Sequence, residues 1–144
     1  MSRLAVFVVA IGLAACGENP ATTPADAAID ADPAIDAAPP RETVMETQSL
    51  AAGEIVEGIL TGGRTDSALI HLEALTPTID WNLHGHNGGG TQMIHEELGK
   101  MTVDYTYVPA SDGDWFVLIR NGGTTNMDVQ VRVDLFANMA WRWQ

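Results

Sequence analysis

The sequence has a single cysteine, Cys16, among its 144 residues. A disulfide bond within the chain is therefore excluded, and the fold must rest on its hydrophobic core. Basic residues are also scarce, since seven lysines and arginines stand against nineteen aspartates and glutamates, for a net charge of −12. An acidic chain of this kind repels polyanions, so nucleic acid is excluded as a partner.

A long hydrophobic run is missing as well. The longest apolar stretch, residues 4–15, has twelve residues and follows Arg3. A transmembrane helix needs about 20 apolar residues, so this stretch is too short to span a bilayer. A positive residue followed by a short apolar run is typical of a secretory signal peptide. We therefore predict that residues 1–15 are a signal peptide.

The apolar stretch ends in Leu13-Ala14-Ala15-Cys16, which resembles the lipobox of bacterial lipoproteins. The resemblance implies that Cys16 is lipidated, becomes the first mature residue after cleavage, and is acylated again at its new amino terminus. Two or three acyl chains, palmitate among them, make a lasting membrane anchor, whereas one does not. Gly17 stands where an aspartate would favour the inner membrane, so the outer membrane is favoured. The alternative is an ordinary signal peptide in which Cys16 has no role.

The stretch after Cys16 has the composition of a tether. Residues 17–40 are dominated by alanine, aspartate and proline, with five acidic residues, no basic residue and no aromatic residue. Such a segment cannot bury enough apolar surface to offset the entropy lost on ordering. The prolines stiffen it and the aspartates repel one another. We interpret residues 16–42 as a disordered tether and residues 43–144 as one domain.

From residue 43 onwards, short alternating runs are separated by turn residues, which indicates antiparallel β structure. Strands are predicted at 43–50, 53–60, 66–74, 78–86, 91–97, 101–108, 114–121 and 127–137. About eight short strands at this spacing predict an all-β, jelly-roll-like sandwich of two antiparallel sheets, and a small barrel is the alternative. Residues 114–121 are apolar on both sides of the alternation, which predicts a central strand covered on both faces.

Two segments resemble known secreted domains. The first, SDGDWFVLIRNGGTTNMDVQVRVDLF at 111–136, is a polar turn, an aromatic and apolar strand, an Asn-Gly turn and a valine-rich strand. It resembles the last hairpin of GOLD-type and bacterial pre-peptidase C-terminal β-sandwiches. The second, TIDWNLHGHNGGG at 78–90, is similar to a strand and loop of GOLD-like domains. The resemblance covers residues 45–137 and implies a binding or interaction module without catalytic machinery.

Three histidines, His84, His86 and His95, fall within twelve residues. In a hairpin that places Leu83 opposite Ile94, all three share the outward face, because residues two apart on a strand point the same way. Such a group suits zinc or copper, which implies a metal-binding lipoprotein as an alternative function. The other interpretation is an ordinary solvent-facing hairpin, and a register shift of one residue would send His95 to the opposite face.

Residues 43–144 contain no recognisable catalytic set. They have no cysteine, no Gly-x-Ser-x-Gly motif around a serine, and no second histidine completing a zinc-protease motif after the His95-Glu96-Glu97 run. We therefore predict no catalytic residue, no resident cofactor and no enzymatic activity.

Two tryptophans flank an arginine in the segment Trp141-Arg142-Trp143. The rings either cover the sandwich as part of a final strand or form an exposed patch for an envelope protein or glycan. The overall expectation is a monomeric envelope lipoprotein, attached to a membrane through Cys16, that presents a β-sandwich as a binding or structural module.

Overall fold

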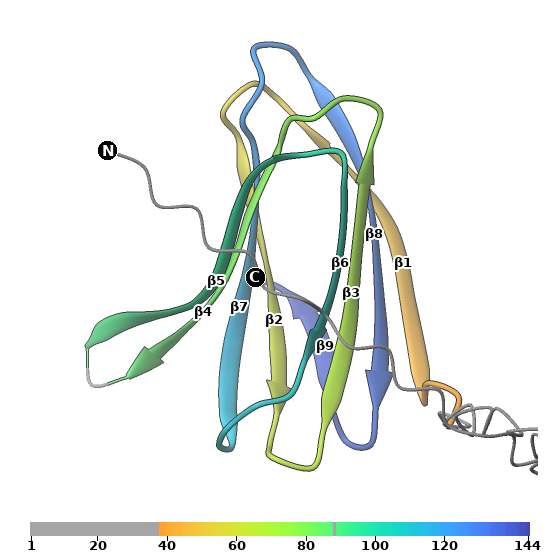
Figure 1. The fold of residues 1–144 in the computed structure, drawn as a ribbon, viewed down its shortest axis with the longest axis vertical. Helices are drawn as coiled ribbons and strands as arrows, with labels where there is room; N and C mark the ends of the chain where they lie inside the picture. The colour runs from red at the N-terminus through yellow and green to blue at the C-terminus, as the bar shows by residue number, and fades with distance from the viewer. Residues whose placement is uncertain (1–37, 88) are drawn as a thin grey trace, which may run out of the picture. The chain divides into compact units, whose positions relative to one another are not determined.

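The computed structural model describes residues 38–87 and 89–144 (Figure 1). The signal peptide, Cys16 and nearly all of the expected tether lie outside these residues. The described part consists of strands and loops, and it holds no helix long and apolar enough to cross a membrane. The strands are β1 (Glu42–Leu50), β2 (Ile55–Gly62), β3 (Ser67–Ala74), β4 (Ile79–Asn87), β5 (Gly90–Lys100), β6 (Thr102–Tyr107), β7 (Gly113–Asn121), β8 (Met127–Phe136) and β9 (Ala140–Trp143).

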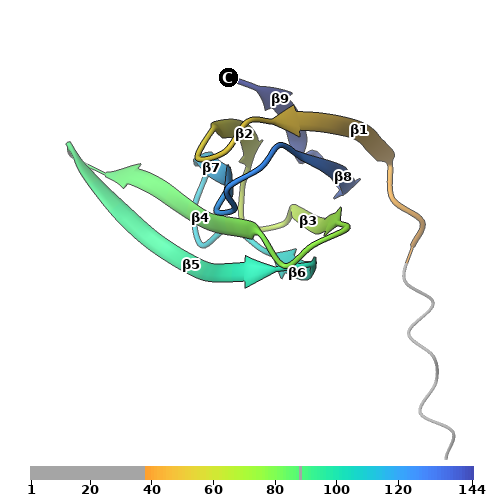
Figure 2. The same cartoon turned by 90° about the horizontal axis from the view of Figure 1, so that it is seen from above.

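The strands form two antiparallel sheets that pack face to face (Figure 2). The four-stranded sheet has the order β1-β8-β3-β6, and the five-stranded sheet has the order β5-β4-β7-β2-β9. The first eight strands pair as nested partners: β1 with β8, β2 with β7, β3 with β6, and β4 with β5. This nesting is the wrapping of a jelly roll. The predicted two-sheet sandwich is confirmed, and β9 extends it by one strand.

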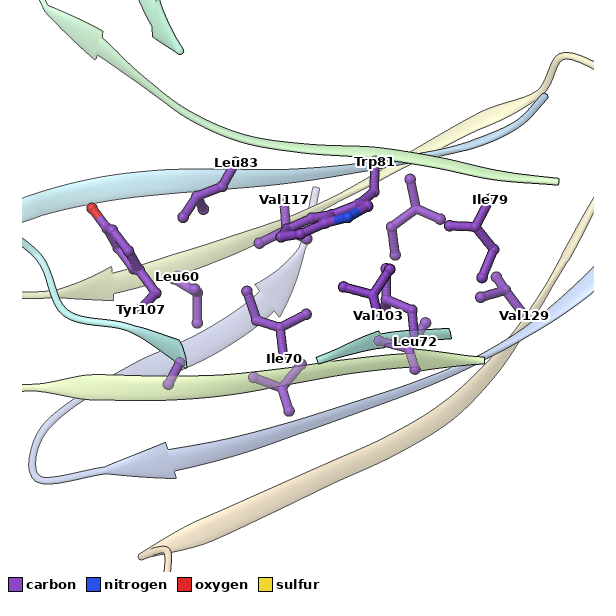
Figure 3. Packing of buried hydrophobic residues seen from close by; sticks show 14 of the residues in the cluster. Leu60, Ile70, Leu72, Ile79, Trp81, Leu83, Val103, Tyr107, Val117 and Val129 are labelled. Atoms are coloured by element: carbon purple, nitrogen blue, oxygen red, sulfur yellow. The ribbon is translucent and has the colours of Figure 1, made fainter. Parts of the chain in front are cut away.

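The core lies between the inner faces of the two sheets (Figure 3). Alternation decides which residues reach it, because every second side chain of a strand points to the same face. In β8 the core residues are Val129, Val131, Val133 and Leu135, while their neighbours Gln130 and Arg132 are exposed. Strand β4 contributes Ile79, Trp81 and Leu83, each at most 1% exposed. The core is therefore built from alternate residues of both sheets, as the sequence pattern predicts.

Strand β7 lies in the middle of the five-stranded sheet, between β4 and β2. Its inner side chains Val117 and Ile119 are fully buried, whereas Phe116 and Leu118 on the outer side are only partly buried. The prediction that this strand is covered on both faces is therefore wrong for the outer face. In the described part of the chain, the apolar outer residues of β7 lie on the surface of the sandwich.

The β4–β5 hairpin departs from regular pairing at two places. Ile79 pairs with Lys100, but Trp81 pairs with Glu97; Leu83 pairs with His95, but His84 pairs with Met93. Each shift places one extra residue in β5, which is the geometry of a β-bulge. At the first shift, Gly99 adopts a positive φ of 64° and donates its N–H to Asp80 Oδ1. The hairpin tip extends away from the other strands (Figures 1 and 2).

Candidate functional site

The outer face of the five-stranded sheet carries a compact group of rings. His84 on β4 pairs with Phe116 on β7, which pairs with Ile59 on β2, so the three side chains share one face. His86 lies two residues further along β4, on the same side. We call His84, His86, Phe116, Ile59 and the adjacent Glu57 the histidine cluster.

Ring contacts hold the histidine cluster together. The His84 ring stacks on Phe116 with centroids 5.4 Å apart and 18° between the planes. His86 meets both rings edge-on, at 5.1 Å from His84 and 4.6 Å from Phe116. As a result His84 is only 7% exposed and Ile59 only 4% exposed, although both lie on the outer side of the sheet. The cluster is thus a small packed layer on the surface.

The imidazole of His84 is oriented by a hydrogen bond with Asn82. Its Nδ1 lies 2.8 Å from Asn82 Oδ1, and since a carboxamide oxygen only accepts, Nδ1 carries the proton. Nε2 is then the unprotonated nitrogen of the neutral ring, 3.6 Å from Glu57 Oε1. Burial lowers the pKa of His84 and outweighs the opposing effect of Glu57, while His86 lowers the pKa further. The buried imidazole is therefore neutral at pH 7.

His95 does not belong to the histidine cluster. Because of the bulge, it pairs with the core residue Leu83 and so lies on the inner side of the hairpin. There it stacks on Tyr105 at 4.5 Å and contacts Trp81 at 5.3 Å. The expected grouping of three histidines on one face is wrong, since the extra residue in β5 turns His95 to the other side. Across residues 38–87 and 89–144, no three His, Cys, Asp or Glu side chains are grouped to hold a metal ion.

Glu97 takes a structural role beside His95. It accepts a hydrogen bond from Trp81 Nε1 at 3.0 Å and pairs with Lys100 Nζ at 2.7 Å. Lys100 and Trp81 together hold the pKa of Glu97 below its usual range. This carboxylate satisfies the indole of a core tryptophan at the sheet edge.

A hollow of about 760 Å³ lies beside the histidine cluster. It is lined by the side chains of His86 and Phe116, by three glycines, and by three carboxylates, the full set being Thr61, Gly62, Gly63, Asp66, His86, Asp112, Gly113, Asp114, Phe116 and Asn138. Strand pairing brings these segments together, since Gly62 pairs with Gly113 and Thr61 pairs with Asp114. In the sequence these segments stand out only as two turns that contain glycine and aspartate. Which turns lie side by side depends on how the strands pair, and a single sequence does not reveal that pairing.

The carboxylates of the hollow have different partners. Asp66 accepts backbone N–H groups of Asn138 and Gly63, and these bonds lower its pKa. Asp114 accepts the Thr61 hydroxyl at 2.6 Å and lies 3.4 Å from an Arg142 nitrogen. Asp66 therefore stabilises the backbone at Gly63 and Asn138, while Asp114 and the exposed Asp112 face solvent.

A second hollow, of about 310 Å³, lies on the same outer face. Its apolar lining comes from Ile55, Leu98 and Leu118, and Ile55 and Leu98 are 51% and 63% exposed. Burial raises the pKa of Asp80 at its edge, but hydrogen bonds from Arg120 and Gly99 outweigh burial and leave the pKa lowered. The outer face therefore joins apolar side chains, imidazoles and carboxylates.

The segment Trp141-Arg142-Trp143 is divided between two faces of β9. Trp141 packs over Gly58, where any side chain would overlap its indole ring. Trp143 contacts Trp141 and donates its indole N–H to Glu46 Oε2 at 2.7 Å, which links β9 to β1 at the edge of the sandwich. Arg142 points to the outer face, towards Asp114. The two rings thus cover the sandwich edge, and they form no common patch with Arg142.

No protein-family model matches this chain, and no curated protein matches it. Among solved structures, the Yersinia pseudotuberculosis-derived mitogen has a TM-score of 0.49 and 15% identity, covering 69% of this chain and 88% of its own. Aeromonas hydrophila PliG, a periplasmic lysozyme inhibitor of g-type lysozyme, has a TM-score of 0.47 and 9% identity, covering 65% and 85%. Neither similarity bears on the function of this chain.

Proposed function

We propose that this chain is a lipid-anchored protein of the bacterial cell envelope whose β-sandwich binds a macromolecular partner through the outer face of the five-stranded sheet. The observation that carries the proposal is the contrast between the two outer faces. One presents exposed and half-buried apolar side chains, Ile55, Leu98, Leu118 and Phe116, around a preformed packed cluster. The other is mostly polar, with the exposed Met45 and the half-buried Leu69 and Phe136 as apolar exceptions.

Apolar side chains gathered on one face are typical of interfaces. A soluble domain gains no stability by leaving such residues in water, whereas a partner that covers them gains free energy from their burial. The rings of the histidine cluster already hold one another in place, so little side-chain entropy is lost when a partner docks. The face is therefore preorganised for binding.

The lipid anchor rests on the resemblance of Leu13-Ala14-Ala15-Cys16 to a lipobox. The outer membrane is favoured as its location, because Gly17 stands where an aspartate would favour the inner membrane. Cell fractionation and palmitate labelling test the anchor. The wild-type chain is expected in the membrane fraction with label, and Cys16→Ser in the soluble fraction without it. A Cys16→Ser chain that stays with membranes would contradict the anchor.

A photo-crosslinking amino acid tests the binding face in cells of the producing bacterium. It is placed at Leu98, on the proposed face, and at Met45, which is 71% exposed on the opposite outer face. Discrete adducts are expected from position 98 and none from position 45. Equal adduct yields from the two positions would contradict the proposed face.

The metal-binding alternative is not proposed further. Its third ligand, His95, lies on the opposite side of the hairpin from His84 and His86 and is engaged with Tyr105 and Trp81.

A further inference from the structure

We infer that the partner is a basic protein and that it docks an arginine or lysine side chain in the hollow beside the histidine cluster. This inference rests on the proposed function, which supplies the binding face, and it adds the chemistry of the occupant. Three features of the face support it: the shape of the hollow, its charge and its aromatic wall.

Glycine makes up part of the backbone that lines the hollow. Gly62, Gly63 and Gly113 contribute no side chains to its lining. A side chain at position 63 would overlap Asp112 Oδ1, so glycine at this position leaves room for the Asp112 carboxylate at the wall of the hollow. A volume of about 760 Å³ lies within the range of small-ligand pockets and accommodates one long side chain.

The charges around the hollow indicate which charge the bound side chain carries. The residues that line the hollow include Asp66, Asp112 and Asp114 but no lysine or arginine. Two arginines lie at its rim: Arg142, whose side chain is 56% exposed, pairs with Asp114, and Arg64, next to Gly63, donates to the Ala110 carbonyl. Residues 38–144 as a whole carry fourteen acidic and six basic side chains. The negative potential of these residues attracts a basic partner and orients it, whereas it repels an acidic partner.

The aromatic wall fits the same occupant. Phe116 and His86 meet at 4.6 Å and both line the hollow, so a guanidinium entering it reaches an aromatic ring and a carboxylate together. Cation–π contact and charge-assisted hydrogen bonds then act on one group. A neutral glycan matches this environment less well, because it would desolvate Asp112 and Asp114 without neutralising them. The neighbouring apolar residues Leu118 and Leu98 suit the protein surface around the inserted side chain.

The test uses the full chain and a blocked peptide, acetyl-Gly-Arg-Phe-Arg-Gly-amide, with the ring NMR signals of Phe116 and His86 as readout. We expect a dissociation constant of about 1 mM. The same peptide with citrulline in place of arginine keeps the shape and loses the charge, and it is expected to bind at least about 10-fold more weakly. Equal binding of the two peptides would overturn the inference.

Two matched variants separate the hollow from the general charge of the chain. Asp112→Asn removes one charge in the hollow, and binding of the arginine peptide is expected to weaken about 5-fold. Glu73→Gln removes one charge from an exposed position on β3, on the opposite outer face, and is expected to change binding less than about 1.5-fold. Equal losses in the two variants would overturn the inference, because attraction would then be general rather than local.

A chito-oligosaccharide serves as the glycan probe. It is expected to leave the Phe116 and His86 signals unchanged. If it shifts them and the arginine peptide does not, the basic occupant is wrong while the proposed binding face stands. If no crosslinks form at position 98, by contrast, the proposed binding face is wrong.

Discussion

The two outer faces of the sandwich are both built on antiparallel strands, but their side chains bond differently. On the four-stranded sheet, cross-strand polar pairs cover the surface, with Thr43 bonded to Asp134 and His71 to Asp104 at 2.6 and 2.7 Å. On the five-stranded sheet, rings stack on one another and apolar side chains reach solvent, with Leu98 as the most exposed of them. The first face bonds its polar groups to one another and exposes the apolar side chain of Met45, whereas the second exposes several apolar side chains.

On the proposed function, the difference assigns stability to one face and recognition to the other. A face whose polar groups are bonded to each other gains little from a partner, since each new hydrogen bond replaces an existing one. A face of apolar side chains gains from burial in proportion to the area covered. The polar face is thus suited to stabilising the sandwich and the apolar face to binding.

The largest expected effect comes from a matched pair of aspartates, one on each face. Asp134 is 4% exposed and is bonded to Thr43 and Arg132, whereas Asp114 makes the equivalent bonds to Thr61 and Arg142 in solvent. Asp134→Ala is expected to lower the free energy of unfolding by about 2 kcal/mol. Asp114→Ala is expected to cost less than about 1 kcal/mol. Urea unfolding of both variants measures the difference. Equal losses would show that the polar face is no more tightly bonded than the apolar one.

A second prediction compares two histidines. His84 is stacked on Phe116 and 7% exposed, whereas the His71 side chain is 32% exposed beside Asp104 and Glu73. His84→Ala removes packing and leaves Asn82 without its ring partner, so a loss of about 1–2 kcal/mol is expected. His71→Ala is expected to cost less than about 1 kcal/mol. Thermal unfolding followed by circular dichroism checks both values, and a larger loss for His71→Ala would refute the assignment of His84 as a packed residue.

The smallest expected effect is a pH dependence specific to the histidine cluster. Since the pKa of folded His84 lies below 6.5, the unfolded chain takes up a proton before the folded chain does. Stability therefore falls as the pH drops below about 7. The groups facing His84 are Glu57 from β2 and His86 from β4. Denaturant unfolding between pH 7.5 and about 5.5 is expected to show this decline in wild type and a shallower one in His84→Gln.

Carboxylates act in a separate window, because the lowered pKa values of Asp66, Asp80 and Glu97 stabilise the fold above their ordinary pKa values of 3.8 to 4.5. That contribution is lost only as the pH falls through and below this range. Identical slopes for wild type and His84→Gln above pH 5 would therefore rule out His84 as the source.

The fold class was predictable because alternation and turns are local signals. Valines at every second position of 129–135 define a strand and its buried side without knowledge of the rest of the chain. All eight predicted strands are present, with ends that differ by a few residues. The ninth strand was harder to assign, because the residues Trp141 to Trp143 fit either a strand or an exposed patch.

The candidate site was only partly predictable. His84 and His86 share a face because they are two apart, which the sequence shows directly. The position of His95 depends on a bulge, and a bulge inserts a residue without changing the hydrophobic pattern enough to reveal it. The hollow depends on the pairing of Gly62 with Gly113, which are far apart in the chain. Contacts of this kind follow from topology and not from local composition.

The nested pairing of strands has a consequence for how the chain reaches its native state. The register joins Glu42 to Leu135, so the first strand has no partner until nearly the whole domain is available. Topologies with such long sequence separations between contacting residues fold slowly, since loop-closure entropy is lost before the contacts form. On the proposed export route, a chain that folds slowly remains unfolded while it crosses the inner membrane, and its two sheets form only afterwards. The same wrapping order that builds the two faces thus delays their formation until nearly the whole domain can pair.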